Sequence, residues 1–298
     1  MANSIKKLTE LRHEFHQYPE LGFQETKTKT KIANFLRAKG LEVIEGVGVI
    51  GVLKSGSGSK TIGLRADMDA LPIQETSKHA YSSKHPGVMH ACGHDGHTTM
   101  LLGAAEELAN SLDFDGTVIF IFQPNEENGL GAKAMLNEGI LSSFPISEIF
   151  ALHNLPGTET GRIITRKGLI CSSESLFEIS LKGQGGHASM PHVGRDTISV
   201  GSEIIQSLQN IISKKLAPGS GSVLSVTEFT SDGARNVLPG NSLIKGDVRS
   251  RNKEDRLEIK RLMGTLVEGI SDAHEITGEV SFETEFVETI NSGDQTET

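Results

Sequence analysis

Apolar residues recur every three or four positions over two stretches at the start of the chain, and this spacing predicts two helices. The first stretch covers about Ser4–Tyr18 and stops before Pro19, because proline disfavours helical backbone in the residue that precedes it. The second covers about Glu25–Lys39, and Gly40 follows it as a helix stop. The chain is therefore expected to open with a pair of helices.

After these helices, short apolar runs alternate with further helical stretches, a pattern typical of α/β domains. Strands are expected at Glu42–Val47, Ile50–Lys54, Thr61–Met68, Gly116–Phe122, Glu148–Leu152 and Gly161–Lys167. Helices are expected between them at Thr98–Leu112 and Leu130–Leu141. Binding sites in open α/β sheets gather at the carboxyl ends of the strands, so polar residues that follow these strands are candidate site residues.

The order of elements changes near residue 172 to strand, helix, two strands, helix and strand, which is the β-α-β-β-α-β unit of ferredoxin-like domains. These elements are expected at Leu176–Lys182, Asp196–Lys214, Ser222–Thr230, Asn241–Ser250, Lys253–His274 and Glu279–Phe286. With 298 residues the chain is long enough for two domains. We predict an α/β domain over residues 1–171, a ferredoxin-like α+β domain over residues 172–290, and the start of a return to the first domain over residues 291–298.

Composition narrows the class of protein. Hydrophobic content of 36% and charged content of 22% predict a globular fold. The net charge of -9 leaves no basic excess to neutralise phosphates, so we expect neither a nucleic-acid nor a membrane partner. Cys92 and Cys171 are too few for a disulfide framework, and the N-terminus lacks the apolar core of a secretion signal. These features predict a cytoplasmic protein.

Metal-ligating side chains are densest in Met89–His97, whose sequence is M-H-A-C-G-H-D-G-H. Cys92 and His94 offer a thiolate and an imidazole, ligands that Zn, Co and Mn accept, and both are expected to point at one ion from a loop. In the alternative interpretation, Cys92 is a small buried apolar residue and the histidines are solvated. A single Cys-Gly-His does not decide between the two.

Three successive strand ends then present residues that suit metal or proton chemistry. Asp67 ends its strand and is expected to orient a metal ligand from behind. Glu126 and Glu127 follow the next strand, where one carboxylate can bind metal while its neighbour takes a proton from water. His153 follows a third strand, expected to be buried. Each residue alone has a surface or core interpretation, but their recurrence favours a metal site.

The second predicted domain carries polar residues of its own. The segment G-Q-G-G-H-A-S-M-P-H places His187 and His192 in a glycine-rich loop, while N-V-L-P and D-V-R contain Asn236 and Arg249. The planar guanidinium of Arg249 suits a free carboxylate, because it pairs with one in a bidentate way.

Taken together, six ordered motifs resemble the metal-dependent N-acyl-amino-acid amidohydrolases. This family includes hippurate hydrolases, auxin-conjugate amidohydrolases and N-acetyl-diaminopimelate deacetylases, and it belongs with the aminoacylase-like metallopeptidases. The motifs are R-A-D-M-D-A-L-P, M-H-A-C-G-H-D-G-H, Q-P-N-E-E, A-L-H, G-G-H-A-S-M-P-H and N-V-L-P. The resemblance implies a metal-dependent exopeptidase-like α/β domain with an inserted ferredoxin-like lid and dimerisation domain.

The resemblance also implies roles for particular residues. The metal ligands would be Cys92, His94, Glu127 and His153, holding two divalent ions of Mn, Zn, Co or Ni. The catalytic residues would be Glu126 as general base, Asp67 behind the metals, and His187 reaching the site of a partner subunit. Asn236 and Arg249 would bind substrate. The expected reaction is hydrolysis of the amide of a small N-acyl amino acid, in a homodimer formed through the lid.

One departure from the family pattern bears on activity. Members continue for roughly a further hundred residues after the lid and there supply a last histidine ligand, whereas this sequence ends at Thr298. His274, near the end of a predicted helix, is a poor substitute. The sequence therefore predicts an under-coordinated metal and an uncovered apolar face, and with them weak activity, poor solubility, or both.

Two other functions stay open on the sequence. The first is a remnant that binds metal and dimerises without turnover. The second is a cysteine hydrolase with Cys92 as nucleophile and a histidine as base, although this would leave Asp67, the two glutamates and His153 without roles. Chelation should abolish the metal-dependent activity, and thiol alkylation alone should abolish the cysteine-dependent one.

Overall fold

The computed structural model describes residues 2–297, with side chains from residue 5 onward. The chain divides into two compact units, Met1–Arg162 and Ile163–Thr298. The sequence placed this boundary nine residues later, at residue 171. In the part of the chain that the structure describes, no helix is both long enough and apolar enough to cross a membrane.

The first unit is built on a five-stranded mixed sheet with strand order β1-β2-β4-β3-β5. The strands are β1 (Glu42–Glu45), β2 (Val49–Ser55), β3 (Thr61–Asp67), β4 (Gly116–Gln123) and β5 (Glu148–Ala151). The pairs β1–β2 and β2–β4 are antiparallel, whereas β3 runs parallel to both β4 and β5. The parallel strands therefore share one carboxyl edge.

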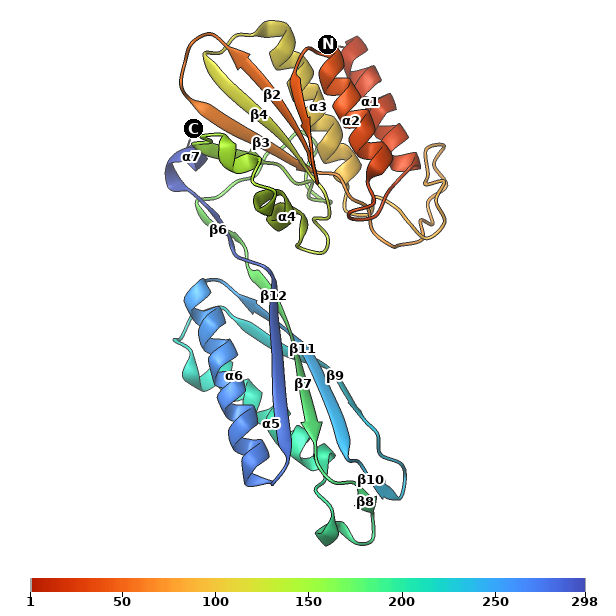
Figure 1. Cartoon of the computed structure of the whole chain (residues 1–298), viewed down its shortest axis with the longest axis vertical. Helices are drawn as coiled ribbons and strands as arrows, with labels where there is room; N and C mark the ends of the chain where they lie inside the picture. Colours follow the sequence, from red (N-terminus) through yellow and green to blue (C-terminus); the bar gives the residue numbers. More distant parts are fainter. Residues whose placement is uncertain (1, 298) are drawn as a thin grey trace. The chain divides into compact units, whose positions relative to one another are not determined.

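Helices cover both faces of this sheet (Figure 1). They are α1 (Ala2–Gln17), α2 (Thr26–Ala38), α3 (His94–Ser111) and α4 (Gly131–Asn137), followed by a 3-10 turn, Leu141–Ser143. Phe120 and Phe122 of β4 are fully buried in the core beneath α1, α2 and α3, while Ile121 packs on the other face with Met135 of α4. Each such buried side chain contributes about 1.5–3 kcal/mol. The sheet that carries the strand ends is thus fixed from both sides.

Two strand predictions in this region were wrong in part. β5 was expected to be buried, but it is an edge strand on which Ile149 is 60% exposed. Gly161–Lys167 was expected to be a strand, but no strand forms there among residues 2–297; the strand β6 (Gly168–Cys171) follows instead. Ile163 and Ile164 have high β-propensity, yet both are exposed, because propensity forms a strand only where a partner strand pairs with it.

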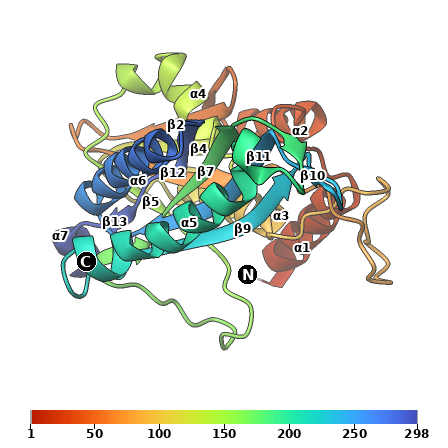
Figure 2. The same cartoon turned by 90° about the horizontal axis from the view of Figure 1, so that it is seen from below.

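The second unit has the predicted β-α-β-β-α-β order. Its antiparallel sheet has the order β12-β7-β11-β9, formed by β7 (Ser173–Lys182), β9 (Val223–Ser231), β11 (Asn241–Ser250) and β12 (Thr277–Phe286). Helices α5 (Thr197–Asn210) and α6 (Lys253–Ala273) lie side by side on one face (Figure 2). α5 continues as a π-helical turn, Ile211–Lys215.

Short elements complete the second unit. β8 (Gly186–His187) pairs with β10 (Val237–Leu238), and a 3-10 turn, Pro191–Val193, follows β8. β6 pairs with β13 (Thr289–Asn291), and the short helix α7 (Gly293–Glu297) follows.

Candidate metal and catalytic site

The predicted site residues of the first unit meet at the carboxyl edge of the parallel strands. Asp67 at the end of β3 lies opposite Gln123 at the end of β4, and Arg65 lies opposite Ala151 at the end of β5. The loops that follow these strands therefore leave the sheet at one place. This is the edge at which sequence reasoning from successive strand ends placed the candidate residues.

The first turn of α3 brings a further ligand to this edge. The helix was expected to begin at Thr98, with His94 in a loop, but it begins at His94, which is fully buried. Gly93 precedes it with φ of 94°, a left-handed conformation that favours glycine. A side chain at Gly93 would also overlap the amide of Asn154. The close approach of these two loops places His94 next to His153.

Cys92, His94 and His153 form one group whose ligand atoms all lie within 4.8 Å of one another. Cys92 Sγ lies 3.3 Å from His153 Nε2. The hydrogen bond to His153 and the neighbouring imidazole of His94 lower the pKa of the Cys92 thiol, and the hydrogen bond to Cys92 raises the pKa of His153 to about 9 despite partial burial. Because thiolate is the form that binds metal, this environment favours the binding-competent state of Cys92.

A second group joins His94 to Glu126 and Glu127. His94 Nε2 lies 3.7 Å from Glu127 Oε1 and 3.9 Å from Glu126 Oε2. Among the described residues, neither His94 Nε2 nor Glu127 Oε1 has a hydrogen-bond partner, although both atoms are buried. Buried polar atoms are rarely left unpaired. A divalent cation between an imidazole and carboxylates would satisfy both atoms, so these residues fit a metal ion.

Asp69, rather than Asp67, orients His94. Asp69 Oδ1 accepts a hydrogen bond from His94 Nδ1 at 3.1 Å, and Oδ2 accepts one from the backbone N–H of Glu127 at 3.1 Å. Burial lowers the pKa of His94, but Asp69 and the other nearby acids outweigh it and raise that pKa to about 11. The sequence predicted that Asp67 orients a metal ligand; at His94 the orienting hydrogen bond comes from Asp69, two residues further along.

Asp67 instead holds His97, a residue that sequence reasoning did not select. Asp67 Oδ1 accepts from His97 Nδ1 at 2.7 Å, and His97 Nε2 accepts from the backbone N–H of Asn154 at 2.9 Å. Both ring nitrogens of His97 are therefore occupied, which leaves no lone pair for a metal. Asn154 O in turn accepts from His153 Nδ1 at 2.7 Å and directs His153 Nε2 toward Cys92.

Glu126 has the environment of a proton acceptor. Burial raises the pKa of Glu126 above its ordinary value, and the negative charges of Asp67 and Glu127 act in the same direction. His94 and Arg65 oppose this shift. A carboxylate with a raised pKa beside a metal-ligating group is suited to general-base chemistry.

The predicted residues of the second unit fall at two places. His187 lies opposite Val237 in the β8–β10 pair, and Asn236 O accepts from the N–H of Ala188 at 3.0 Å, so His187 and Asn236 are neighbours. Arg249 lies eight residues along β11 from Asn241, roughly 27 Å in an extended strand. Within this unit the structure does not bring Arg249 to Asn236.

Arg249 is also occupied by other acids. Its Nε donates to Asp247 Oδ2 at 2.9 Å, and its Nη2 pairs with Glu174. A substrate carboxylate would have to compete with these two carboxylates for the guanidinium.

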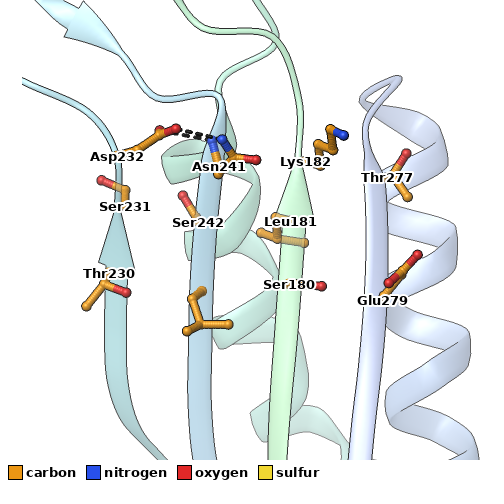
Figure 3. Close-up of a pocket in the computed structure, with 11 residues that line it drawn as sticks. Ser180, Leu181, Lys182, Thr230, Ser231, Asp232, Asn241, Ser242, Thr277 and Glu279 are labelled. Carbon is orange, nitrogen blue, oxygen red and sulfur yellow. Dashed lines mark hydrogen bonds between the residues drawn. The ribbon is translucent and has the colours of Figure 1, made fainter.

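An open groove of about 610 Å³ crosses the strands of the second unit at the Asn241 end of β11 (Figure 3). Hydroxyl groups line much of it, including those of Ser180, Thr230 and Thr277. Asp232, on its rim, is engaged by the backbone and side-chain amides of Asn241. Of the predicted site residues, none lines this groove in the part of the chain that the structure describes.

A cysteine, histidines and carboxylates that fit a divalent ion, beside an acid with a raised pKa on the carboxyl edge of an α/β sheet, are the arrangement of a metal-dependent hydrolase. The chain belongs to Peptidase family M20/M25/M40, whose sequence model matches residues 63–290.

Relatives within this family are similar over most of the chain. A hippurate hydrolase of Campylobacter jejuni is 42% identical over 269 residues, covering 89% of this chain and 70% of the relative. An N-acetyldiaminopimelate deacetylase of Bacillus cytotoxicus is 37% identical, covering 94% and 75%. The solved structure of the YXEP protein of Bacillus subtilis, a dinuclear metal binding peptidase, has a TM-score of 0.86 at 33% identity, covering 100% of this chain and 78% of that one.

Proposed function

We propose that this chain hydrolyses the amide bond of N-acyl amino acids, consuming one water and releasing a carboxylic acid and a free amino acid. The observation that carries the proposal is the pair of buried, unpaired ligand atoms, His94 Nε2 and Glu127 Oε1 among the described residues, beside the carboxylate of Glu126. The similarity to proteins named hippurate hydrolase and N-acetyldiaminopimelate deacetylase supports this substrate class.

Four residues would hold two divalent ions, drawn from Mn, Zn, Co or Ni. They are Cys92, His94, Glu127 and His153, which fall into two of the three groups that share His94. When bound, such ions polarise a carbonyl and lower the pKa of water. Asp69 and Asn154 would keep the two imidazoles in the tautomer that leaves Nε2 free for an ion.

Glu126 would carry the proton through the reaction. Its carboxylate takes a proton from the attacking water as the water oxygen bonds to the amide carbon. It then gives that proton to the amide nitrogen as the carbon–nitrogen bond breaks, so the leaving group departs as a neutral amine. Glu126 ends the cycle ionised, as it began.

The second unit would complete the site in a homodimer. We propose that His187 stabilises the developing oxyanion in the site of a partner subunit, with Asn236 beside it as a substrate contact. A role for Arg249 requires that its pairs with Glu174 and Asp247 open to admit the substrate carboxylate.

The test combines metal content with turnover. Chelator-treated protein is re-loaded with Mn or Zn, metal per chain is measured by elemental analysis, and hippurate and N-acetyl amino acids are assayed for released amine. We expect two ions per chain in the wild type and fewer in Cys92→Ala. Glu126→Gln should keep its metal but lose at least a hundredfold in kcat.

Different failures of this test have different meanings. Folded wild type that retains no metal would overturn the metal site. Metal binding without turnover on any N-acyl amino acid would support the remnant that binds metal and does not catalyse. Full activity in Glu126→Gln would overturn the role of Glu126 while leaving the reaction itself in place.

A further inference from the structure

The turn that carries Glu126 and Glu127 begins with a residue in an unusual conformation. Asn125 has φ of 44°, in the left-handed region, and it is only 2% exposed. Asparagine tolerates this conformation better than most residues, but something must still hold it. The backbone direction at Asn125 decides where the next two carboxylates point.

Glu25, from a distant part of the sequence, stabilises this conformation of Asn125. The backbone N–H of Asn125 donates to Glu25 Oε1 at 2.8 Å, across 100 residues of chain. Glu25 is itself 2% exposed, and burial raises the pKa of its carboxyl group. Burying a carboxyl group is costly unless it makes a hydrogen bond, and the hydrogen bond from the Asn125 amide offsets this cost for Glu25.

Capping of α2 does not account for Glu25. It stands at the N-cap position, yet within the described residues its side chain makes no capping hydrogen bond. The free N–H groups of this helix end are met by Glu20, whose carboxylate accepts from the N–H groups of Lys27 and Thr28. Glu20 therefore caps the N-terminus of α2, which is the usual role of an acidic residue at the N-cap position.

The segment Pro19–Glu25 contacts both the loop that carries Asp69 and the turn that carries Glu126. The N–H of Ala70, next to Asp69, donates to Glu20 O at 2.9 Å. Gly22 packs directly on the side chain of Asn125, where an added Cβ would overlap the amide. One short segment thus braces the Asp69 loop and the Glu126 turn together.

We propose that Glu25 is a positioning residue: its carboxylate fixes Asn125 in the left-handed conformation from which Glu126 and Glu127 both reach His94. The inference rests on the proposed function for its effect on catalysis, but the contact with Asn125 is testable without activity.

The experiment compares Glu25→Ala and Glu25→Gln with a matched control, Glu138→Ala. Glu138 also binds a backbone amide of the first unit, that of Val47 at 2.9 Å, but in the turn between β1 and β2. Removing a residue that orients metal ligands lowers activity or metal affinity about 10–100-fold. We expect that loss in kcat and in Co²⁺ affinity for Glu25→Ala, with KM changed less than about threefold. Glu25→Gln keeps an acceptor oxygen and should recover most of the loss.

Hydrogen exchange at the Asn125 amide supplies a readout that needs neither metal nor substrate. Exchange there should rise at least tenfold in Glu25→Ala and stay unchanged in Glu138→Ala. If Glu25→Ala does not fold, Gly22→Ala displaces Asn125 from the other side and should lower kcat in the same way.

Unchanged exchange, metal affinity and kcat in folded Glu25→Ala would overturn the inference. An equal loss of kcat in Glu138→Ala would overturn it as well, since the effect would then be general destabilisation. A third outcome is faster exchange in Glu25→Ala together with a wild type that binds no metal. The contact between Glu25 and Asn125 would then stand, and the proposed function would be refuted instead.

Discussion

Replacing His97 with alanine tests whether the cluster is held by residues that do not bind metal themselves. The substitution removes two contacts at once: the donor to Asp67 at 2.7 Å and the acceptor for the Asn154 N–H at 2.9 Å. Asp67 is fully buried and would keep its pair with Arg65 and the longer contact with His94 Nε2 at 3.7 Å. We expect His97→Ala to lower both stability and metal affinity.

The two hydrogen bonds set the size of the loss in stability. A hydrogen bond to a charged group contributes about 1.5–3 kcal/mol, and a neutral one about 0.5–1.5 kcal/mol. The free energy of unfolding of the first unit should therefore fall by about 2–4.5 kcal/mol. Metal affinity should fall about 10–100-fold, because Asn154 also accepts the hydrogen bond that directs His153.

Both losses are measurable on one protein preparation. Tyrosine fluorescence during urea unfolding reports on the first unit alone, because Tyr18 and Tyr81 are the two tyrosines of the sequence and both lie there. Co²⁺ titration of the chelated protein gives the affinity. His274→Ala is the control, since His274 makes an exposed pair with Glu203 in the second unit. Reduced stability with unchanged Co²⁺ affinity would refute the claim that His97 orients His153.

Two further predictions concern stability. Arg256→Met leaves the carboxylate of Glu288, which is 6% exposed, without its main partner, and it should destabilise the second unit by about 3–5 kcal/mol. Circular dichroism during urea unfolding measures this loss. A loss no larger than that caused by Arg261→Met, at an exposed position, would contradict the prediction. The second concerns His16, whose pKa is raised above 6.5 by the hydrogen bond to Asp95 although burial acts in the opposite direction. The contribution of protonated His16 to the free energy of unfolding is therefore complete below pH 6.5, and it is lost as the pH rises through the pKa of His16 in the folded protein. Tyrosine-monitored unfolding should show this slope in the wild type and not in His16→Ala.

The convergence of Asp67, Glu127 and His153 could be predicted from the sequence because parallel strands share an edge. Three apolar runs each end in a ligand-type residue, and parallel pairing of β3 with β4 and β5 brings those ends together. No side-chain direction has to be known for this inference. Sequence order and strand polarity are enough to gather the residues.

The choice between Asp67 and Asp69 needed information that the sequence does not hold. Both residues follow the same strand, two positions apart, and both are fully buried. Which one faces His94 depends on how the chain turns after β3 and on where α3 begins. The unforeseen start of that helix at His94 also left His97 one turn further along, facing Asp67.

Apolar pattern was a poor guide to burial at the edge of the first unit. β5 and the residue after it form the continuous apolar run of a core strand, yet Ile149 and Leu152 are more than half exposed. Gly161–Lys167 has the composition of a strand and forms a loop. The apolar pattern of a segment shows which structure the segment favours. Whether it pairs as a strand and becomes buried depends on the elements that the rest of the fold places beside it.

The arrangement around the cluster implies that its ligands are oriented before any metal arrives. His94 is held through Nδ1 by Asp69, His153 through Nδ1 by Asn154, and the Glu127 amide by Asp69 again. Each contact leaves the metal-facing atom free and fixes the opposite side of the group. Ligands ordered in this way lose little conformational entropy on binding. Residues behind the ligands should therefore affect metal affinity nearly as strongly as the ligands themselves, and Glu25 extends that dependence to a segment 100 residues away from the turn it holds.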